Sequence, residues 1–234
     1  MRYLLPELLW TGISISVYTG LLVPIIYDTM PESKSYNEKF QASMMAMMTL
    51  GVGEVLGGIV MGYLVDKYGS KNTTYINIFN TMMASALVGL YLYQDSYSYL
   101  AYIMTFYWGL QDSCISIHID SILGFEFQTT KEPFSVDSFM EALTVFTFEM
   151  IQSLISGRQE TIAYVFLVGL MGVSFNYCTL HFKFRQKSII PDNFLENYMS
   201  QKMSSVDPVH ADSDLMMLSS SKGDLSTSIN TSIQ

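Results

Sequence analysis

The chain has 234 residues, of which 50% are hydrophobic and only 14% are charged, and its formal net charge at pH 7 is −9. So few charged residues argue against a soluble enzyme, and the acidic balance argues against nucleic acid as a partner. We therefore expect an integral membrane protein, with the lipid bilayer as a partner.

Apolar stretches of about 20 residues, enough to cross a bilayer core, recur along most of the chain. They predict an all-α membrane protein with six transmembrane helices, at residues 4–27, 41–65, 74–94, 98–125, 134–156 and 161–183. The first stretch contains Pro6 and Glu7 and has no small-residue cleavage pattern. We therefore expect it to be a retained helix and not a cleaved signal peptide.

The end of the chain has a different composition. Residues 188–234 are rich in Ser, Asp and Asn and lack the apolar density that offsets the entropy of ordering. This predicts a disordered cytosolic tail after a six-helix bundle at residues 1–187. The basic residues near the helix ends fall on one side of an even-crossing topology, which predicts that both termini are cytosolic. These residues are Arg2, Lys67, Lys71, Lys183, Arg185 and Lys187.

A polar stripe follows the fourth predicted helix. At about 100° per residue, Gly109, Asp112, Ser113, Ser116 and Asp120 fall on one side. A carboxylate is costly in hydrocarbon, so such residues usually face the interior of a bundle or a water-filled cavity. For Asp112 and Asp120 both alternatives remain open, lining a cavity or hydrogen-bonding to a neighbouring helix.

His118 falls on the opposite side of the same helix. We expect it to hydrogen-bond to a neighbouring helix, and a role in a proton relay is the alternative.

The fifth predicted helix repeats the polar pattern. Asp137, Glu141, Thr144 and Gln152 lie on one side, with Glu149 on the flank. Polar faces on two helices predict a shared cavity. The predicted substrate-binding residues are Asp112, Ser116, Asp120, Glu141 and Glu149.

The second predicted helix carries Glu54 on the same face as Gly51, Gly58 and Gly62. Small residues at this spacing let a second backbone approach closely, so we assign Glu54, Gly51 and Gly58 to helix packing. Asn77 in the third helix is expected to hydrogen-bond between helices, as is Asn80.

The sequence contains none of the residue patterns that are typical of metal sites, catalytic sites or phosphate-binding loops. His118, His181 and His210 are isolated, and no nucleophile–base pair or phosphate-binding loop occurs. We therefore expect neither an enzymatic activity nor a cofactor or metal.

A motif links the second and third predicted helices. It reads Gly62-Tyr-Leu-Val-Asp66-Lys67-Tyr-Gly69-Ser-Lys71-Asn72. This resembles the major facilitator signature G-xxx-D-[RK]-x-G-x-[RK]-[RK], with Asn72 in place of the last basic residue. In such a cytosolic loop, Asp66 would lie near the positive N-terminus of the next helix, Gly69 would permit a tight turn, and Lys67 and Lys71 would pair with acidic groups.

Two further blocks, at residues 51–58 and 108–114, together with residues 122–124 and Pro133-Phe134, resemble uncoordinated-93-like proteins. These form the branch of the major facilitator superfamily described as ion-channel regulatory proteins, and the resemblance is to their C-terminal half. It implies one major-facilitator-type half bundle, completed by a second six-helix bundle that is either a missing N-terminal half or a second copy. Two functions remain open: half of a small-solute transporter with a polar midplane cavity, or a non-transporting membrane regulator or escort of an ion channel or receptor.

Overall fold

The computed structural model describes residues 2–127 and 131–184, which contain helices and no β-strand. The helices are α1 (Leu5–Val17), the π-helical turn η1 (Tyr18–Leu22), α2 (Val23–Asp28), α3 (Tyr36–Tyr68), α4 (Ser70–Gln94), α5 (Leu100–Phe125), α6 (Lys131–Ser153) and α7 (Arg158–Thr179). The predicted tail at residues 188–234 lies outside the described residues.

Four helical segments are long and apolar enough to cross a membrane. They are Leu5–Asp28, Tyr36–Tyr68, Ser70–Gln94 and Arg158–Thr179. The chain is therefore a multi-pass membrane protein, as its composition predicts. Helices α5 and α6 occupy the positions of the fourth and fifth predicted spans, but they do not belong to this set. That all six helices cross the membrane stays a prediction.

The first predicted span is not one regular α-helix, because its series of backbone hydrogen bonds is interrupted before Pro24. Proline has no N–H to donate to the carbonyl of Gly20 four residues earlier, and its ring crowds that carbonyl. The chain accommodates this with the π-helical turn at Tyr18–Leu22 and then resumes as α2. Such π-turns inside α-helices often occur at functional sites.

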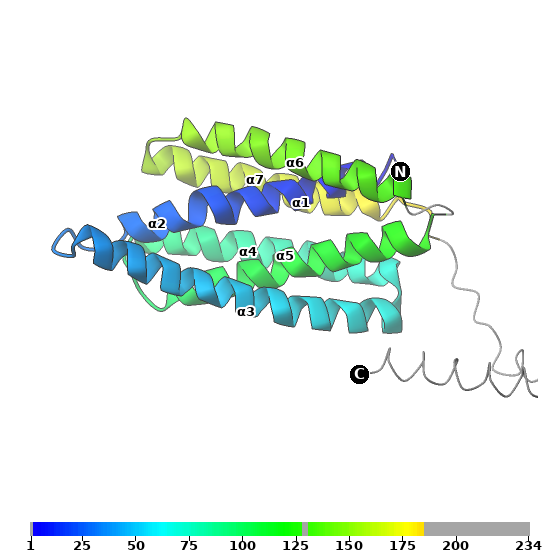
Figure 1. Ribbon diagram of the computed structural model, residues 1–234, viewed down its shortest axis with the longest axis horizontal. Helices are drawn as coiled ribbons and strands as arrows, with labels where there is room; N and C mark the ends of the chain where they lie inside the picture. The colour runs from blue at the N-terminus through cyan, green and yellow to red at the C-terminus, as the bar shows by residue number, and fades with distance from the viewer. Residues whose placement is uncertain (1, 128–130, 185–234) are drawn as a thin grey trace, which may run out of the picture. The chain divides into compact units, whose positions relative to one another are not determined.

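The helices pack side by side as a bundle (Figure 1). Helix α1 contacts α6, α7 and α5, and α4 contacts α5, α7 and α3. Helix α3 packs mainly along α5. The loops after α2, α4 and α6 lie at one end of the bundle, and the start of α1 and the end of α7 lie at the other end (Figure 1).

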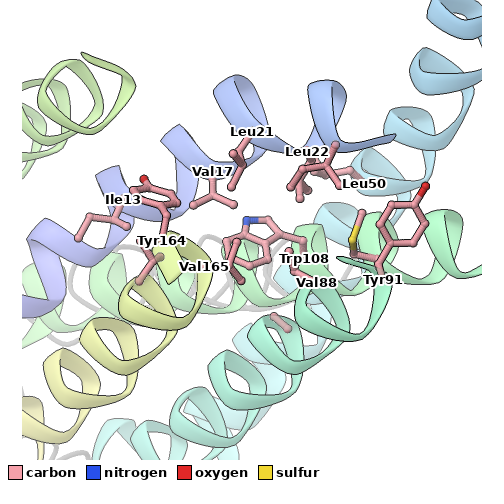
Figure 2. Packing of buried hydrophobic residues seen from close by; sticks show 14 of the residues in the cluster. Ile13, Val17, Leu21, Leu22, Leu50, Val88, Tyr91, Trp108, Tyr164 and Val165 are labelled. Carbon is pink, nitrogen blue, oxygen red and sulfur yellow. The ribbon is translucent and has the colours of Figure 1, made fainter. Parts of the chain in front are cut away.

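The apolar core lies where α1, α4, α5 and α7 meet. Trp108 of α5 lies between Val17 of α1, Val88 of α4 and Val165 of α7 (Figure 2). The Trp108 side chain is only 2% exposed, and its Nε1 donates a hydrogen bond to the carbonyl of Ser14 at 3.2 Å. A buried indole N–H that has a hydrogen-bond partner carries no uncompensated cost of desolvation. Because this bond joins the two helices, Trp108 fixes α1 against α5.

Three glycines bring α3 and α5 into backbone contact. An added Cβ at Gly53 would lie 2.0 Å from the carbonyl oxygen of Phe106, and one at Gly57 would lie 2.4 Å from that of Leu110. From the other helix, a Cβ at Gly109 would lie 2.1 Å from the carbonyl oxygen of Leu50. The contact is therefore a small-xxx-small crossing.

The glycines assigned to packing from the sequence lie on the neighbouring face of α3. A Cβ at Gly51 or at Gly62 would have no heavy atom within 4 Å, and one at Gly58 would meet only the Ser113 hydroxyl at 3.1 Å and the Ile117 side chain at 3.8 Å. Within the bundle, close backbone packing thus uses Gly53 and Gly57 in place of Gly51 and Gly58, because α5 contacts the adjacent side of the helix. A packing role of Gly51, Glu54 and Gly58 toward a second protein stays a prediction.

Candidate functional site

Three helices bring carboxylates together around one tyrosine. Asp112 of α5 interacts electrostatically with Glu54 of α3 and with Glu141 of α6. Tyr18, in the π-helical turn, interacts with all three. Asp112 is only 8% exposed, whereas Glu54 and Glu141 are partly exposed. We call Glu54, Asp112, Glu141 and Tyr18 the polar face.

Asp120 lies two turns further along α5 than Asp112 and is exposed. It interacts electrostatically with Asp137 and with Glu141 of α6. Asp120 therefore extends the polar face toward the end of the bundle where α1 begins. Ser116, between the two aspartates, uses its hydroxyl locally and donates to the carbonyl of Asp112 at 3.1 Å.

Glu149 is separated from this group. It follows Glu141 by eight residues on α6, which is about 12 Å along a helix axis. Its carboxylate accepts a hydrogen bond from the Thr19 hydroxyl at 2.9 Å, near the opposite end of the bundle. The five predicted substrate-binding residues are thus not one cluster: four lie on or near the polar face, and Glu149 lies apart.

The remaining polar residues of α6 that the helical phase grouped with Glu141 contact α1. Thr144 packs on Gly12, where an added Cβ would lie 2.8 Å from the Thr144 Cβ. Gln152 is 7% exposed, and its Nε2 donates to the hydroxyls of Tyr164 at 2.8 Å and Ser16 at 3.3 Å. These two side chains therefore join α6 to α1 and α7.

A buried ion pair joins α1 to α5. His118 Nδ1 lies 3.0 Å from Oε1 of Glu7, and both side chains are 0% exposed. His118 Nε2 lies 2.8 Å from the carbonyl oxygen of Ser70, at the start of α4. The expected hydrogen bond of His118 to a neighbouring helix is confirmed. Three elements distant in sequence meet at this imidazole.

The predicted cytosolic loop motif lies at the same end of the bundle. Gly69 alone separates α3 from α4, and its φ of +77° with ψ of 157° is a conformation that favours glycine. Lys67 Nζ lies over the rings of Tyr63 and Tyr68 and donates to the Tyr63 hydroxyl at 3.2 Å. Asp66 and Lys71 are exposed, and Gly62 is part of α3. Lys67 thus lies against aromatic rings of its own helix.

Two residues of this arrangement do not follow from the sequence patterns. Tyr18 joins the polar face because the π-helical turn orients it, and Glu7 is the partner of His118 across 111 residues of sequence. The one clue to Glu7 is a carboxylate in an apolar stretch, which calls for a buried partner. Among the described residues, no group of three or more His, Cys, Asp or Glu is arranged to hold a metal ion.

Comparisons with known proteins give one family. Neither the curated proteins nor the solved structures contain a significant match to this chain. The family described as "Ion channel regulatory protein UNC-93" matches residues 1–175, which include α1 to α6 and most of α7. The match confirms the family that the sequence blocks predict, and the chain belongs to the UNC-93 family of ion channel regulatory proteins.

Proposed function

We propose that this protein is a non-transporting membrane regulator or escort of an ion channel or receptor. The family match over residues 1–175 carries the proposal, because the family is described by ion-channel regulation. The arrangement of helices supports it, since the bundle has an open side where a partner could pack.

The open side includes the free face of α3. Met48, Val55 and Ile59 are 70%, 65% and 67% exposed there, and Glu54 lies among them only partly buried. A carboxylate facing lipid is costly, whereas one facing a partner can be hydrogen-bonded. We therefore propose that a second helical bundle covers the polar face, as in a major facilitator whose C-terminal half this chain would be. In that arrangement α5 and α6 also cross the membrane and both termini are cytosolic.

The regulator proposal predicts a stable membrane partner, and its recovery should depend on the second helical bundle that covers the free face of α3. Full-length tagged protein, solubilised in a mild detergent from cells that express it, should co-purify a channel or receptor whose current or surface abundance falls when the protein is depleted. Gly51→Trp places a bulky ring on that face where no bundle atom lies within 4 Å. We expect it to reduce partner recovery about tenfold or more, as loss of a central interface contact does.

The matched control is Ala163→Trp, which adds the same ring to an exposed position of α7. It should leave recovery unchanged. If the protein co-purifies with itself alone, the proposed partner is contradicted. If both variants reduce partner recovery equally, the proposed surface is contradicted.

Small-solute transport is the second candidate, and the polar face is the observation that favours it. A carboxylate as buried as Asp112, beside Glu54 and Glu141, is typical of a solute or ion pathway. In proteoliposomes given a panel of labelled small solutes, Asp112→Asn should then lower uptake at least about tenfold. Glu32→Gln, which removes an exposed loop carboxylate, should not. Accumulation of no solute, or equal uptake by Asp112→Asn, would count against transport.

A further inference from the structure

A groove of about 450 Å³ lies between α4 and α7. Met82 of α4 and Phe166 and Leu170 of α7 line it, and all three side chains are exposed. Neither helix contributes a residue to the polar face. The groove is therefore separate from the candidate site and from the free face of α3.

The shape of the groove depends on small residues. The helices touch where an added Cβ at Gly169 would lie 2.9 Å from the Cβ of Ser85. One turn further along α4, a Cβ at Gly89 would have no heavy atom within 4 Å. The surface is hollow beside Gly89, so a larger side chain there would fill the groove without a clash at its Cβ.

The lining of the groove is apolar. Among the described residues, Ser85 is the one lining residue with a polar side chain. Both α4 and α7 belong to the set of helices that are long and apolar enough to cross a membrane. A groove on such helices faces hydrocarbon, and the apolar molecule that a bilayer presents there is a lipid acyl chain.

An ion pair lies at one end of the groove. Leu92 lines the groove, and its carbonyl accepts a hydrogen bond from the Arg158 guanidinium at 2.6 Å. Arg158 also donates to the Asp95 carboxylate, and the two side chains are 48% and 53% exposed. Ile162, one turn after Arg158 on α7, lines the groove as well. A cation and an anion thus lie side by side where the apolar lining ends.

Exposed tyrosines accompany this ion pair. Tyr93 precedes Asp95 at the end of α4, and Tyr99 follows it just before α5 begins. Exposed tyrosines at the end of a membrane span are typical of the membrane–water interface, where lipid headgroups lie. A zwitterionic headgroup carries a phosphate beside an ammonium, which matches the guanidinium of Arg158 beside the carboxylate of Asp95.

We propose that this groove binds a zwitterionic glycerophospholipid with a primary ammonium group. One acyl chain lies along the groove over Gly89, the phosphate accepts hydrogen bonds from Arg158, and the ammonium donates to Asp95. The site goes beyond the regulatory function proposed above and does not depend on it.

Two probes with the same acyl chains test the role of the headgroup. Dioleoyl phosphatidylethanolamine has both charges, and dioleoylglycerol has neither. Each is titrated into the delipidated full-length protein in detergent, and native mass spectrometry gives the fraction of protein that carries lipid. We expect saturable binding of the phospholipid and affinity for dioleoylglycerol that is about tenfold weaker or less, because charge-assisted hydrogen bonds are lost.

One substitution fills the groove, and a matched one adds the same side chain elsewhere. Gly89→Leu occupies the space of the acyl chain and should weaken phospholipid binding about tenfold, the effect of losing about two buried methylene groups. Gly124→Leu adds the same side chain at the end of α5, where an added Cβ also has no heavy atom within 4 Å. It should leave binding unchanged.

Two further substitutions test the ion pair. Arg158→Gln removes the cation and should weaken phospholipid binding about tenfold, whereas Arg158→Lys keeps the charge and should restore most of the affinity. Asp95→Asn should weaken binding in the same direction. Asparagine tolerates the left-handed conformation that Asp95 adopts at the end of α4, with a φ of 49°.

The proposal is overturned if the wild-type protein binds neither lipid, or binds both equally. It is also overturned if any monodisperse protein among Gly89→Leu, Arg158→Gln and Asp95→Asn binds the phospholipid as tightly as the wild type does. A dimer in the same spectra that Gly89→Leu dissociates and Gly124→Leu does not would overturn it too, because a second copy of the chain would then occupy the groove.

Discussion

Replacing Gly53 by alanine is expected to separate α3 from α5 and to lower the free energy of unfolding by about 1–3 kcal/mol, the usual cost of overpacking. The added Cβ would lie 2.0 Å from the carbonyl oxygen of Phe106 and 2.9 Å from the backbone nitrogen of Leu110. Both are main-chain atoms, so no rotamer change relieves the clash. The helices themselves must move.

The same crossing contains Gly109, and Gly109→Ala tests it from the other helix. Its Cβ would lie 2.1 Å from the carbonyl oxygen of Leu50. We expect a similar loss of stability, and a less than additive loss in the double variant with Gly53→Ala, because the first substitution already separates the two backbones.

Helix α3 also provides the matched controls. Gly51→Ala and Gly62→Ala add the same methyl group to the same helix, where no bundle atom lies within 4 Å. Alanine is the better helix former, so both variants should unfold at or slightly above the wild-type temperature. Thermal unfolding of the detergent-solubilised protein, followed by circular dichroism, measures all four. A fall in stability for Gly51→Ala equal to that for Gly53→Ala would contradict the assigned contact.

The glycines of α3 show what can be predicted from the sequence and what cannot. Apolar length places the helix correctly, at residues 41–65 within the observed Tyr36–Tyr68. Glycines occur on two of its faces, however, at residues 51, 58 and 62 and at residues 53 and 57. Periodicity groups residues by face, but it does not say which face a neighbouring helix covers. That choice depends on α5, whose own Gly109 meets the second face.

In the candidate site, too, helical periodicity predicts some features and not others. The helical phase of α5 correctly separates His118 from the side that carries Asp112 and Asp120. The phase of α6 places Glu149 near Glu141 in angle, but about 12 Å of helix rise separates them, and Glu149 contacts Thr19 beside the π-helical turn. That turn follows from Pro24, whereas apolar length alone predicts an unbroken helix at residues 4–27. Angular position therefore predicts which residues share a side, whereas depth along the bundle and partners on other helices come only from the tertiary structure.

Removing one partner of the Glu7–His118 pair should have the largest effect of any single substitution in the bundle. His118→Leu leaves the Glu7 carboxylate, which is 0% exposed, without its one observed hydrogen bond. Breaking a buried ion pair from one side typically costs about 3–5 kcal/mol, because the remaining group stays buried without compensation. Oε2 of Glu7 already has no partner, so the carboxylate has no alternative bond to form.

The double variant Glu7→Leu/His118→Leu separates the cost of an orphaned group from the value of the pair. Two apolar side chains of similar volume can replace a buried pair at little cost, so the double variant should be more stable than either single variant. It still lacks the contact of His118 Nε2 with the carbonyl oxygen of Ser70, at 2.8 Å, which holds the start of α4. We therefore expect recovery that is incomplete by about 1 kcal/mol, the net contribution of one hydrogen bond.

The control for the double-mutant cycle is His181→Leu, which removes an exposed histidine whose ring contacts only Tyr3 and Tyr177 among the described aromatic residues, and it should lower stability by no more than about 1.5 kcal/mol. Unfolding in detergent, measured for all variants at one pH, gives the coupling energy. If the two single losses simply add in the double variant, then Glu7 and His118 do not stabilise each other. A positive coupling instead identifies this imidazole as the polar link between the first helix and the turn that begins α4.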